Sequence, residues 1–124
     1  MKKILCFGNE FLKQDSLAKE LADELEIPNY KFIKCNSVND ILESKGDLII
    51  MDVVKDIKQV KIITDIDQLK ANKLYSLHDF DLGFFLKLLK ETGKIKTIKI
   101  IGIPQTGNKE KIKQEIYSQL ISKK

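Results

Sequence analysis

Leu48-Ile49-Ile50-Met51, followed directly by Asp52, is the segment that decides the fold of this chain. It is the most apolar run in the sequence, and no polar residue alternates with its aliphatic ones. A strand whose side chains are apolar on both sides needs cover on both faces, which is typical of a central strand in a parallel sheet. We therefore predict that this run lies at the centre of a parallel sheet, with Asp52 at the carboxyl end of the strand.

Other strand and helix patterns alternate along the rest of the chain. Strands are predicted at residues 4–7, 30–35, 59–64 and 98–103, and helices after residue 15, over 36–42, after His78 and around 112–121. This alternation predicts a three-layer α/β/α fold, with a twisted, mostly parallel five-stranded sheet flanked by helices. A chain of 124 residues with 43% hydrophobic content is expected to form a single domain, residues 1–124.

The helix boundaries carry their own signals. The first helix has an apolar face of Leu17, Leu21 and Leu25, and Asp15 or Ser16 is its expected N-cap. The helix after His78 is expected to stop at Gly93, which can adopt the left-handed conformation of a C-cap. The lysine-rich helix around residues 109–113 is read as a solvated helix face.

Composition excludes several classes of protein. The net charge is +4, from 22 basic and 18 acidic residues, and the lysines are scattered rather than clustered, so we expect no nucleic-acid groove. The apolar run at the start is too short for a signal peptide, and no window approaches a membrane span, so we predict a soluble cytoplasmic protein with no membrane partner. Cys6 and Cys35 lie in strand-like segments and are expected to be buried thiols.

Polar side chains follow the predicted strands where ligands collect in open α/β sheets, at the carboxyl ends. Gly8, Asn9 and Asp15 come after the first strand, Asp52 ends the central one, and His78 begins a helix. Two carboxylates and an imidazole from three loops provide oxygen and nitrogen ligands for a transition metal. From the pattern alone Asp15 fits an N-cap equally well, Asp52 fits a turn cap, and a lone His78 fits an ordinary helix start.

The order of these motifs resembles that of the nickel–iron hydrogenase maturation endopeptidases. The matching segments are Gly8-Asn9, Gln14-Asp15, the aliphatic strand ending on Asp52, Ser76-Leu77-His78, Leu82-Gly83 and Gly102-Ile103-Pro104. Together they cover nearly the whole chain in order. The resemblance marks this chain as a compact, divergent relative, with Gln14 in place of the first of two adjacent acids.

The resemblance implies an activity and a site. Such enzymes are metal-dependent endopeptidases that remove a C-terminal extension from the hydrogenase large-subunit precursor after nickel insertion. Asp15, Asp52 and His78 then correspond to the metal-binding and catalytic residues, while Gly8 and Asn9 shape the substrate-binding floor. The nickel is sensed in the substrate, and a surrogate divalent ion can occupy the same ligands. The family also implies a monomer whose partner is the precursor.

Two alternatives remain open at this point. The family's Asp-Gly-Gly-Thr segment after the second strand is replaced by Cys35-Asn36-Ser37, which favours a non-catalytic module that recognises a hydrogenase subunit or nickel site without cutting. A phospho-acceptor or magnesium-binding signalling domain could use Asp52 instead. That chemistry needs an acidic pair after the first strand and a lysine after the last, where this chain has Gly8-Asn9 and Pro104-Gln105.

Overall fold

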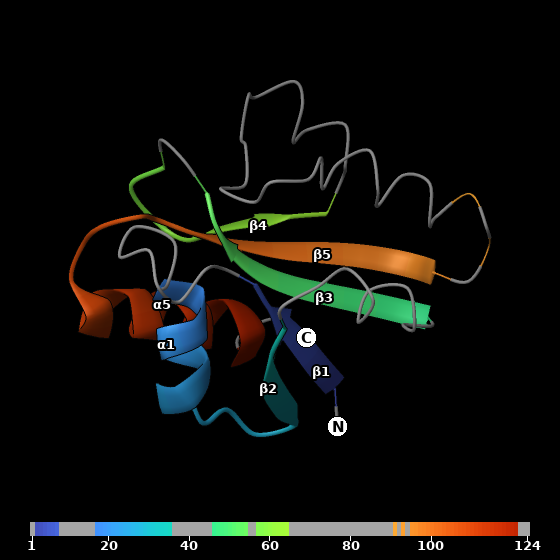
Figure 1. The fold of residues 1–124 in the computed structure, drawn as a ribbon, viewed down its shortest axis with the longest axis horizontal. Helices are drawn as coiled ribbons and strands as arrows, with labels where there is room; N and C mark the ends of the chain where they lie inside the picture. The colour runs from blue at the N-terminus through green and yellow to red at the C-terminus, as the bar shows by residue number, and fades with distance from the viewer. Residues whose placement is uncertain are drawn as a thin grey trace.

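A five-stranded sheet with two helices forms the framework of the protein (Figure 1). The computed structural model describes residues 2–7, 17–35, 46–54, 57–64, 91, 93 and 95–121. The strands are β1 (Lys2–Cys6), β2 (Tyr30–Lys34), β3 (Gly46–Val53), β4 (Lys61–Ile63) and β5 (Ile95–Ile103), and the helices are α1 (Leu17–Glu24) and α5 (Lys109–Ile121). The strand order is β2-β1-β3-β5-β4.

The central position of β3 follows from its sequence. Its residues from Leu48 to Val53 are all buried, because an uninterrupted aliphatic run has no face that water can solvate favourably. β3 pairs in parallel with β1 on one side and with β5 on the other. β4 is the one antiparallel strand among those described, and it pairs with the far side of β5.

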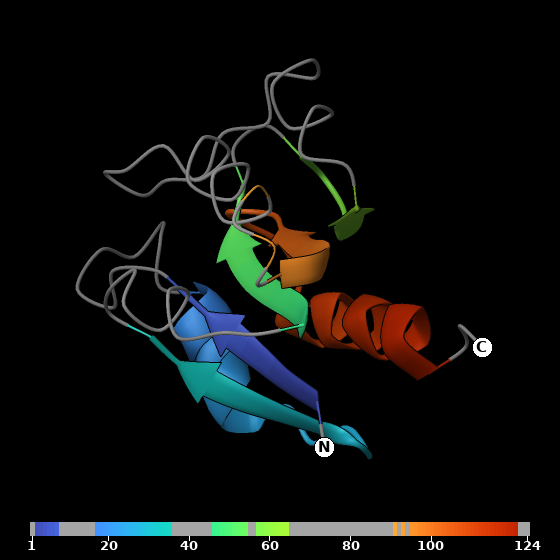
Figure 2. The ribbon, with the colours of Figure 1, turned by 90° about the vertical axis from the view of Figure 1, so that its right-hand side faces the viewer.

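The sheet separates two apolar clusters. Both described helices lie on one face of the sheet (Figures 1 and 2), where Leu21 of α1 and Ile116 of α5 pack with Met51 and Ile101. The opposite face carries a second buried cluster that includes Leu5, Ile50 and Ile100. Neighbouring side chains of a strand point to opposite faces, so Ile50 and Met51 belong to different clusters. The prediction of a mostly parallel sheet buried on both faces is confirmed.

Element boundaries differ from the sequence-based expectations at several ends. α1 stops at Glu24, ahead of Pro28, and β5 begins three residues earlier than predicted, at Ile95. Gly93 has a φ of 80°, the left-handed conformation predicted for it as a C-cap. The helix predicted over 36–42 lies outside the described residues, and so does the helix predicted after His78 apart from Glu91, which is helical.

Candidate functional site at the carboxyl end of β3

The strand order defines where a ligand site is expected. β2 lies on one side of β1 and β3 lies on the other, so the direction in which the chain crosses the sheet reverses between β1 and β3. In open α/β sheets this reversal leaves a crevice at the carboxyl ends of the two strands, where ligands bind. Asp52, the next-to-last residue of β3, flanks this point.

Asp52 lies near the carboxyl end of β3, the middle strand of the sheet, and is almost completely buried, with 1% of its surface exposed. Its backbone pairs with Gly102 of β5, and the Phe7 N–H donates to the Met51 carbonyl at 3.0 Å on the β1 side. The Val53 N–H donates to Asp52 Oδ1 at 2.9 Å. Such a bond fixes the orientation of the carboxylate, as outer-shell partners do for metal ligands.

A buried carboxylate is costly unless a partner or a cation compensates its charge. Asp52 takes part in further interactions within the protein, and alternation along β3 places its side chain on the face of Ile50 and Val54, away from α1 and α5. Its oxygen donors fit a divalent transition metal. Asp52 is therefore a suitable metal ligand at the position where the topology predicts a ligand.

The two cysteines lie close to this position and are both buried. Cys6 and Cys35 are free thiols, and both are buried, as the sequence predicts. Burial raises the pKa of the Cys6 thiol far above its ordinary value, and the neighbouring Cys35 and Asp52 raise it further. Because the thiolate is the nucleophile and the metal ligand, Cys6 is unsuited to either role.

Of the predicted site residues, Asp52 alone falls in the described part of the chain. Gly8, Asn9, Asp15 and His78 lie outside it, so their predicted convergence on Asp52 stays a prediction. Within the described ranges, no group of three or more histidine, cysteine, aspartate or glutamate side chains is positioned to hold a metal ion. None of the described helices is long and apolar enough to cross a membrane.

Lys19 is a second charged side chain that the sequence analysis did not single out. It lies in the first turn of α1 and is only 4% exposed, and it interacts with other groups of the protein. Among the described residues, Lys19 and Asp52 are the buried side chains that carry charge. Lysines are rarely buried, and no local pattern distinguishes this one from the exposed lysines of the same chain.

Gly102 lies next to Asp52 on β5, and its lack of a side chain has a clear structural reason. A Cβ at this position would meet Val54 Cγ2 at 3.0 Å, which is tighter than ordinary contacts between carbon atoms. Val54 is itself buried and lies in the cluster on the Asp52 face. The glycine therefore allows the end of β3 to pack closely against β5 beside the buried carboxylate.

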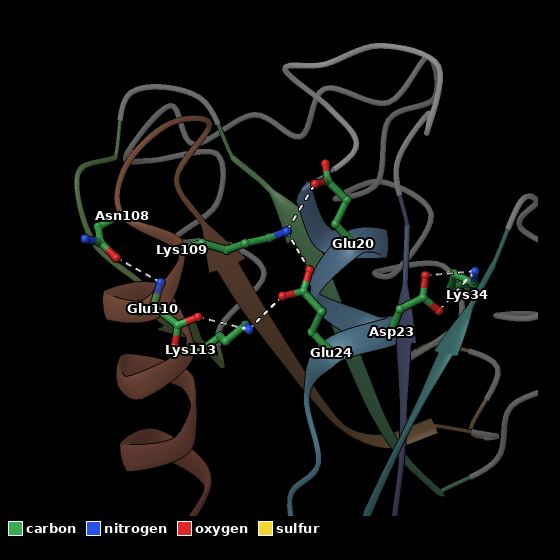
Figure 3. Close-up of polar contacts among 8 residues, drawn as sticks. All are labelled: Glu20, Asp23, Glu24, Lys34, Asn108, Lys109, Glu110 and Lys113. Carbon is green, nitrogen blue, oxygen red and sulfur yellow. Dashed lines mark hydrogen bonds and ion pairs between the residues drawn. The ribbon is translucent and has the colours of Figure 1, made fainter.

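An ion-pair network holds α1, the helix that follows Asp15 in the sequence, against α5 (Figure 3). Glu24 of α1 accepts bonds from Lys109 at 2.5 Å and from Lys113 at 2.7 Å, and Lys109 also reaches Glu20 at 3.3 Å. Asn108 Oδ1 accepts the Glu110 N–H at 2.9 Å and caps α5. Lys109 and Lys113, which the sequence predicts to lie on a solvated helix face, therefore also join α5 to α1.

The network shifts the titration of its members. Hydrogen bonds from Lys109 and then Lys113 lower the pKa of Glu24, and the bond to Glu24 raises the pKa of Lys109 and that of Lys113. Each pair is solvent-accessible, so the stabilisation is modest and sensitive to salt.

Together, the mostly parallel sheet, which is buried on both faces, and the buried carboxylate at its switch point define the class: an α/β protein whose candidate site lies at the carboxyl ends of β1 and β3. No protein-family model matches the chain, and no curated protein matches it. Solved structures do share its fold. The hydrogenase maturating endopeptidase HybD from Escherichia coli superposes with a TM-score of 0.68 and 17% identity, over 98% of this chain and 91% of that one.

Two further structures agree with this likeness. The [NiFe] hydrogenase maturation protease HybD from Thermococcus kodakarensis has a TM-score of 0.62 at 19% identity, over 98% of this chain and 97% of its own. The hydrogenase 3 maturation protease has a TM-score of 0.67 at 22% identity, over 97% and 89%. The chain therefore has the fold of the hydrogenase maturation endopeptidases, and the resemblance predicted from its motifs is confirmed at the level of the fold.

Proposed function

We propose that this protein is an endopeptidase of hydrogenase maturation, which removes the C-terminal extension of a nickel–iron hydrogenase large-subunit precursor after nickel insertion. The observation that carries the proposal is the position of Asp52. A buried carboxylate stands next to the last residue of the central strand, at the switch point, at the place where the motif order of the family has an aspartate. The shared fold and the near-complete coverage of its relatives support the same reading.

In this proposal the nickel belongs to the substrate. Asp15, Asp52 and His78 contact the nickel of the precursor, and Gly8 and Asn9 shape the floor against which the chain is cut. Carboxylate and imidazole ligands suit nickel, and three protein ligands leave positions that the substrate's own groups can fill. The ion acts as a template and Lewis acid near the scissile bond, while an aspartate helps to activate water.

The decisive experiment is incubation with a nickel-loaded precursor, followed by mass spectrometry of the large subunit. The wild type is expected to release the C-terminal extension, and Asp52→Asn is expected to leave it intact. A precursor without nickel is the matched control, because cutting it equally fast would contradict nickel sensing. Monomeric behaviour in sedimentation and a single cooperative unfolding transition would support the expected monomer and its single domain.

Recognition without cleavage is the second candidate, and one observation favours it. The residue that follows β2 is the buried Cys35, whose N–H donates to the Cys6 carbonyl at 2.8 Å. The segment that begins there replaces the family's Asp-Gly-Gly-Thr sequence, which is linked to substrate handling. A stable complex with an uncut precursor, under conditions in which a related endopeptidase cuts, would select this candidate over proteolysis.

A further inference from the structure

Among the described residues, no strand pairs with the outer edge of β2. β2 is the terminal strand of the described order β2-β1-β3-β5-β4, and Figure 2 shows it at the margin of the framework. None of its five residues is fully buried. Edge strands that stay accessible expose backbone donors and acceptors to which another extended chain can bind.

The hydrogen bonds between β1 and β2 identify which backbone groups face outward. The Lys2 N–H donates to the Asn29 carbonyl, and the Cys35 N–H donates to the Cys6 carbonyl. Backbone groups of successive strand residues point to alternate sides. Since Asn29 and Cys35 face β1, the odd-numbered residues between them also do, and the even-numbered residues of β2 face away from the sheet.

Five backbone groups of β2 therefore point to the outer edge. They are the carbonyls of Tyr30, Phe32 and Lys34 and the N–H groups of Phe32 and Lys34. The Tyr30 N–H is not among them, because it already donates to the Ile27 carbonyl at 3.1 Å. Donors and acceptors that alternate at strand spacing are complementary to an extended polypeptide. Binding of this kind gains affinity from main-chain hydrogen bonds and specificity from pockets for alternate side chains.

A groove beside this edge supplies such a pocket. It has a volume of about 520 Å³ and is lined in part by Ala22, Leu25, Tyr30 and Phe32. Tyr30 and Phe32 are only partly buried although they pack against the core. Apolar side chains on one face of an added strand would cover these two rings and remove their apolar surface from water, which favours binding.

The charges on β2 indicate the chemistry of the added strand. Lys31 and Lys34 are exposed; Lys34 pairs with Asp23 at 3.1 Å, whereas Lys31 has no ion pair among the described residues. A second copy of this chain, which carries a net charge of +4, would bring the same lysines to the shared edge. Opposite charges across neighbouring strands stabilise pairing, so an acidic segment fits better than a second copy.

We propose that the outer edge of β2 binds an extended, acidic segment of the precursor polypeptide as an additional strand of the sheet. The identity of this occupant rests on the proposed function. An added strand lies three strand spacings from β3, or roughly 14 Å, a distance that about four extended residues span. A precursor docked at β2 can therefore reach Asp52 with a short connecting segment.

The test uses a capped peptide of alternating glutamate and valine, with a lysine–valine peptide as its control. Backbone amide shifts are followed by NMR during titration of the full chain. The amides of Phe32 and Lys34 are expected to shift and to gain protection from hydrogen exchange, while those of Lys31 and Ile33, which face β1, change little. Shifts confined to another surface, equal binding of both peptides, or no binding would overturn the proposal.

Two variant pairs sharpen the test. Lys34→Pro removes a backbone N–H that points outward, and proline is tolerated on a free strand edge. Lys34→Ala is the matched control, because both variants lose the ion pair with Asp23. We expect at least tenfold weaker peptide binding for the proline variant than for the alanine variant. Lys31→Glu should weaken binding of the acidic peptide about tenfold. Lys61 is an exposed lysine on β4, so its replacement in Lys61→Glu should leave the affinity for the peptide unchanged. Equal affinities within both pairs would contradict docking at β2.

The outcomes separate this proposal from the proposed function. Peptide binding at β2 without any cleavage of the nickel-loaded precursor would refute the endopeptidase and leave the edge as a binding site for acidic strands. Normal cleavage with equal kcat/KM for Lys34→Pro and Lys34→Ala would refute docking and leave the endopeptidase intact. A wild-type dimer that Lys34→Pro converts to a monomer would identify a second copy as the occupant instead.

Discussion

Replacement of Asp52 by asparagine or by alanine separates the charge of this side chain from its hydrogen bond. Asp52 Oδ1 accepts the Val53 N–H at 2.9 Å in a site with 1% exposure. Asparagine keeps a side-chain oxygen of the same reach and removes the negative charge. Alanine removes both, so the Val53 N–H loses this partner in the interior of the protein.

The expected magnitudes follow from this geometry. A buried donor without an acceptor costs about 1–3 kcal/mol, so Asp52→Ala should be less stable than Asp52→Asn by that amount. For a chain of this size the difference corresponds to roughly 4–12 °C in Tm. The asparagine variant keeps an acceptor for the Val53 N–H, so its stability should lie closer to that of the wild type than the stability of the alanine variant does.

The assay combines unfolding in guanidinium chloride, followed by circular dichroism, with calorimetric titration of nickel. The asparagine variant should fold normally and bind nickel at least tenfold more weakly than the wild type, because a neutral amide is a poorer metal ligand than a carboxylate. Nickel binding equal to that of the wild type would refute the assignment of Asp52 as a ligand. Equal stability of the alanine and asparagine variants would refute the structural role of the bond to Val53.

Three further predictions concern the helix pair, the end of β5 and the buried thiol. The lowered pKa of Glu24 means that its stabilisation is present above the ordinary value of 4.5 and is lost as pH falls through the folded value. The urea midpoints of the wild type and Glu24→Gln should therefore differ at pH 7 and approach each other as the pH falls below 4.5. A difference between the midpoints that does not change with pH would contradict this. Gly102→Ala places a Cβ 3.0 Å from Val54 Cγ2. It should lower the free energy of unfolding by about 1–2 kcal/mol, because overpacking outweighs the smaller gain from a less flexible unfolded chain. An unchanged urea midpoint would count against this prediction. Burial and the raised pKa of Cys6 should slow its alkylation by iodoacetamide at pH 8 at least 100-fold relative to the urea-unfolded chain. Similar alkylation rates in the folded and unfolded chains would show that the thiol is accessible.

Much of the fold was predictable because its signals are local. The aliphatic run before Asp52 requires burial on both faces wherever it occurs, and β3 is central and buried as predicted. The left-handed conformation of Gly93 was also predictable from a local signal, because glycine adopts a positive φ without steric cost. The motif order likewise predicted the fold shared with the hydrogenase maturation endopeptidases.

The candidate site was predictable only as a set of residues at strand ends. Asp52 could be singled out because it is the first polar residue after the aliphatic run, and the structure shows it buried one residue before the end of β3, with Oδ1 bonded to the Val53 N–H. The burial of Lys19 gave no signal, because the helix periodicity around it is that of an ordinary amphipathic helix. Convergence of Asp15 and His78 on Asp52 is a long-range relation, and it stays a prediction.

Within the described residues, the sequence by itself determined the strands and helices to within a few residues at their ends, and it identified the strand that is buried on both faces. These features depend on the periodicity of apolar residues over a few positions. Tertiary structure alone decided that β4 pairs antiparallel with β5, that Lys109 and Lys113 join α5 to α1, and that β2 is the terminal strand on its side of the described sheet. Such features arise when segments distant in the chain pack together, and local patterns do not encode which surfaces will meet.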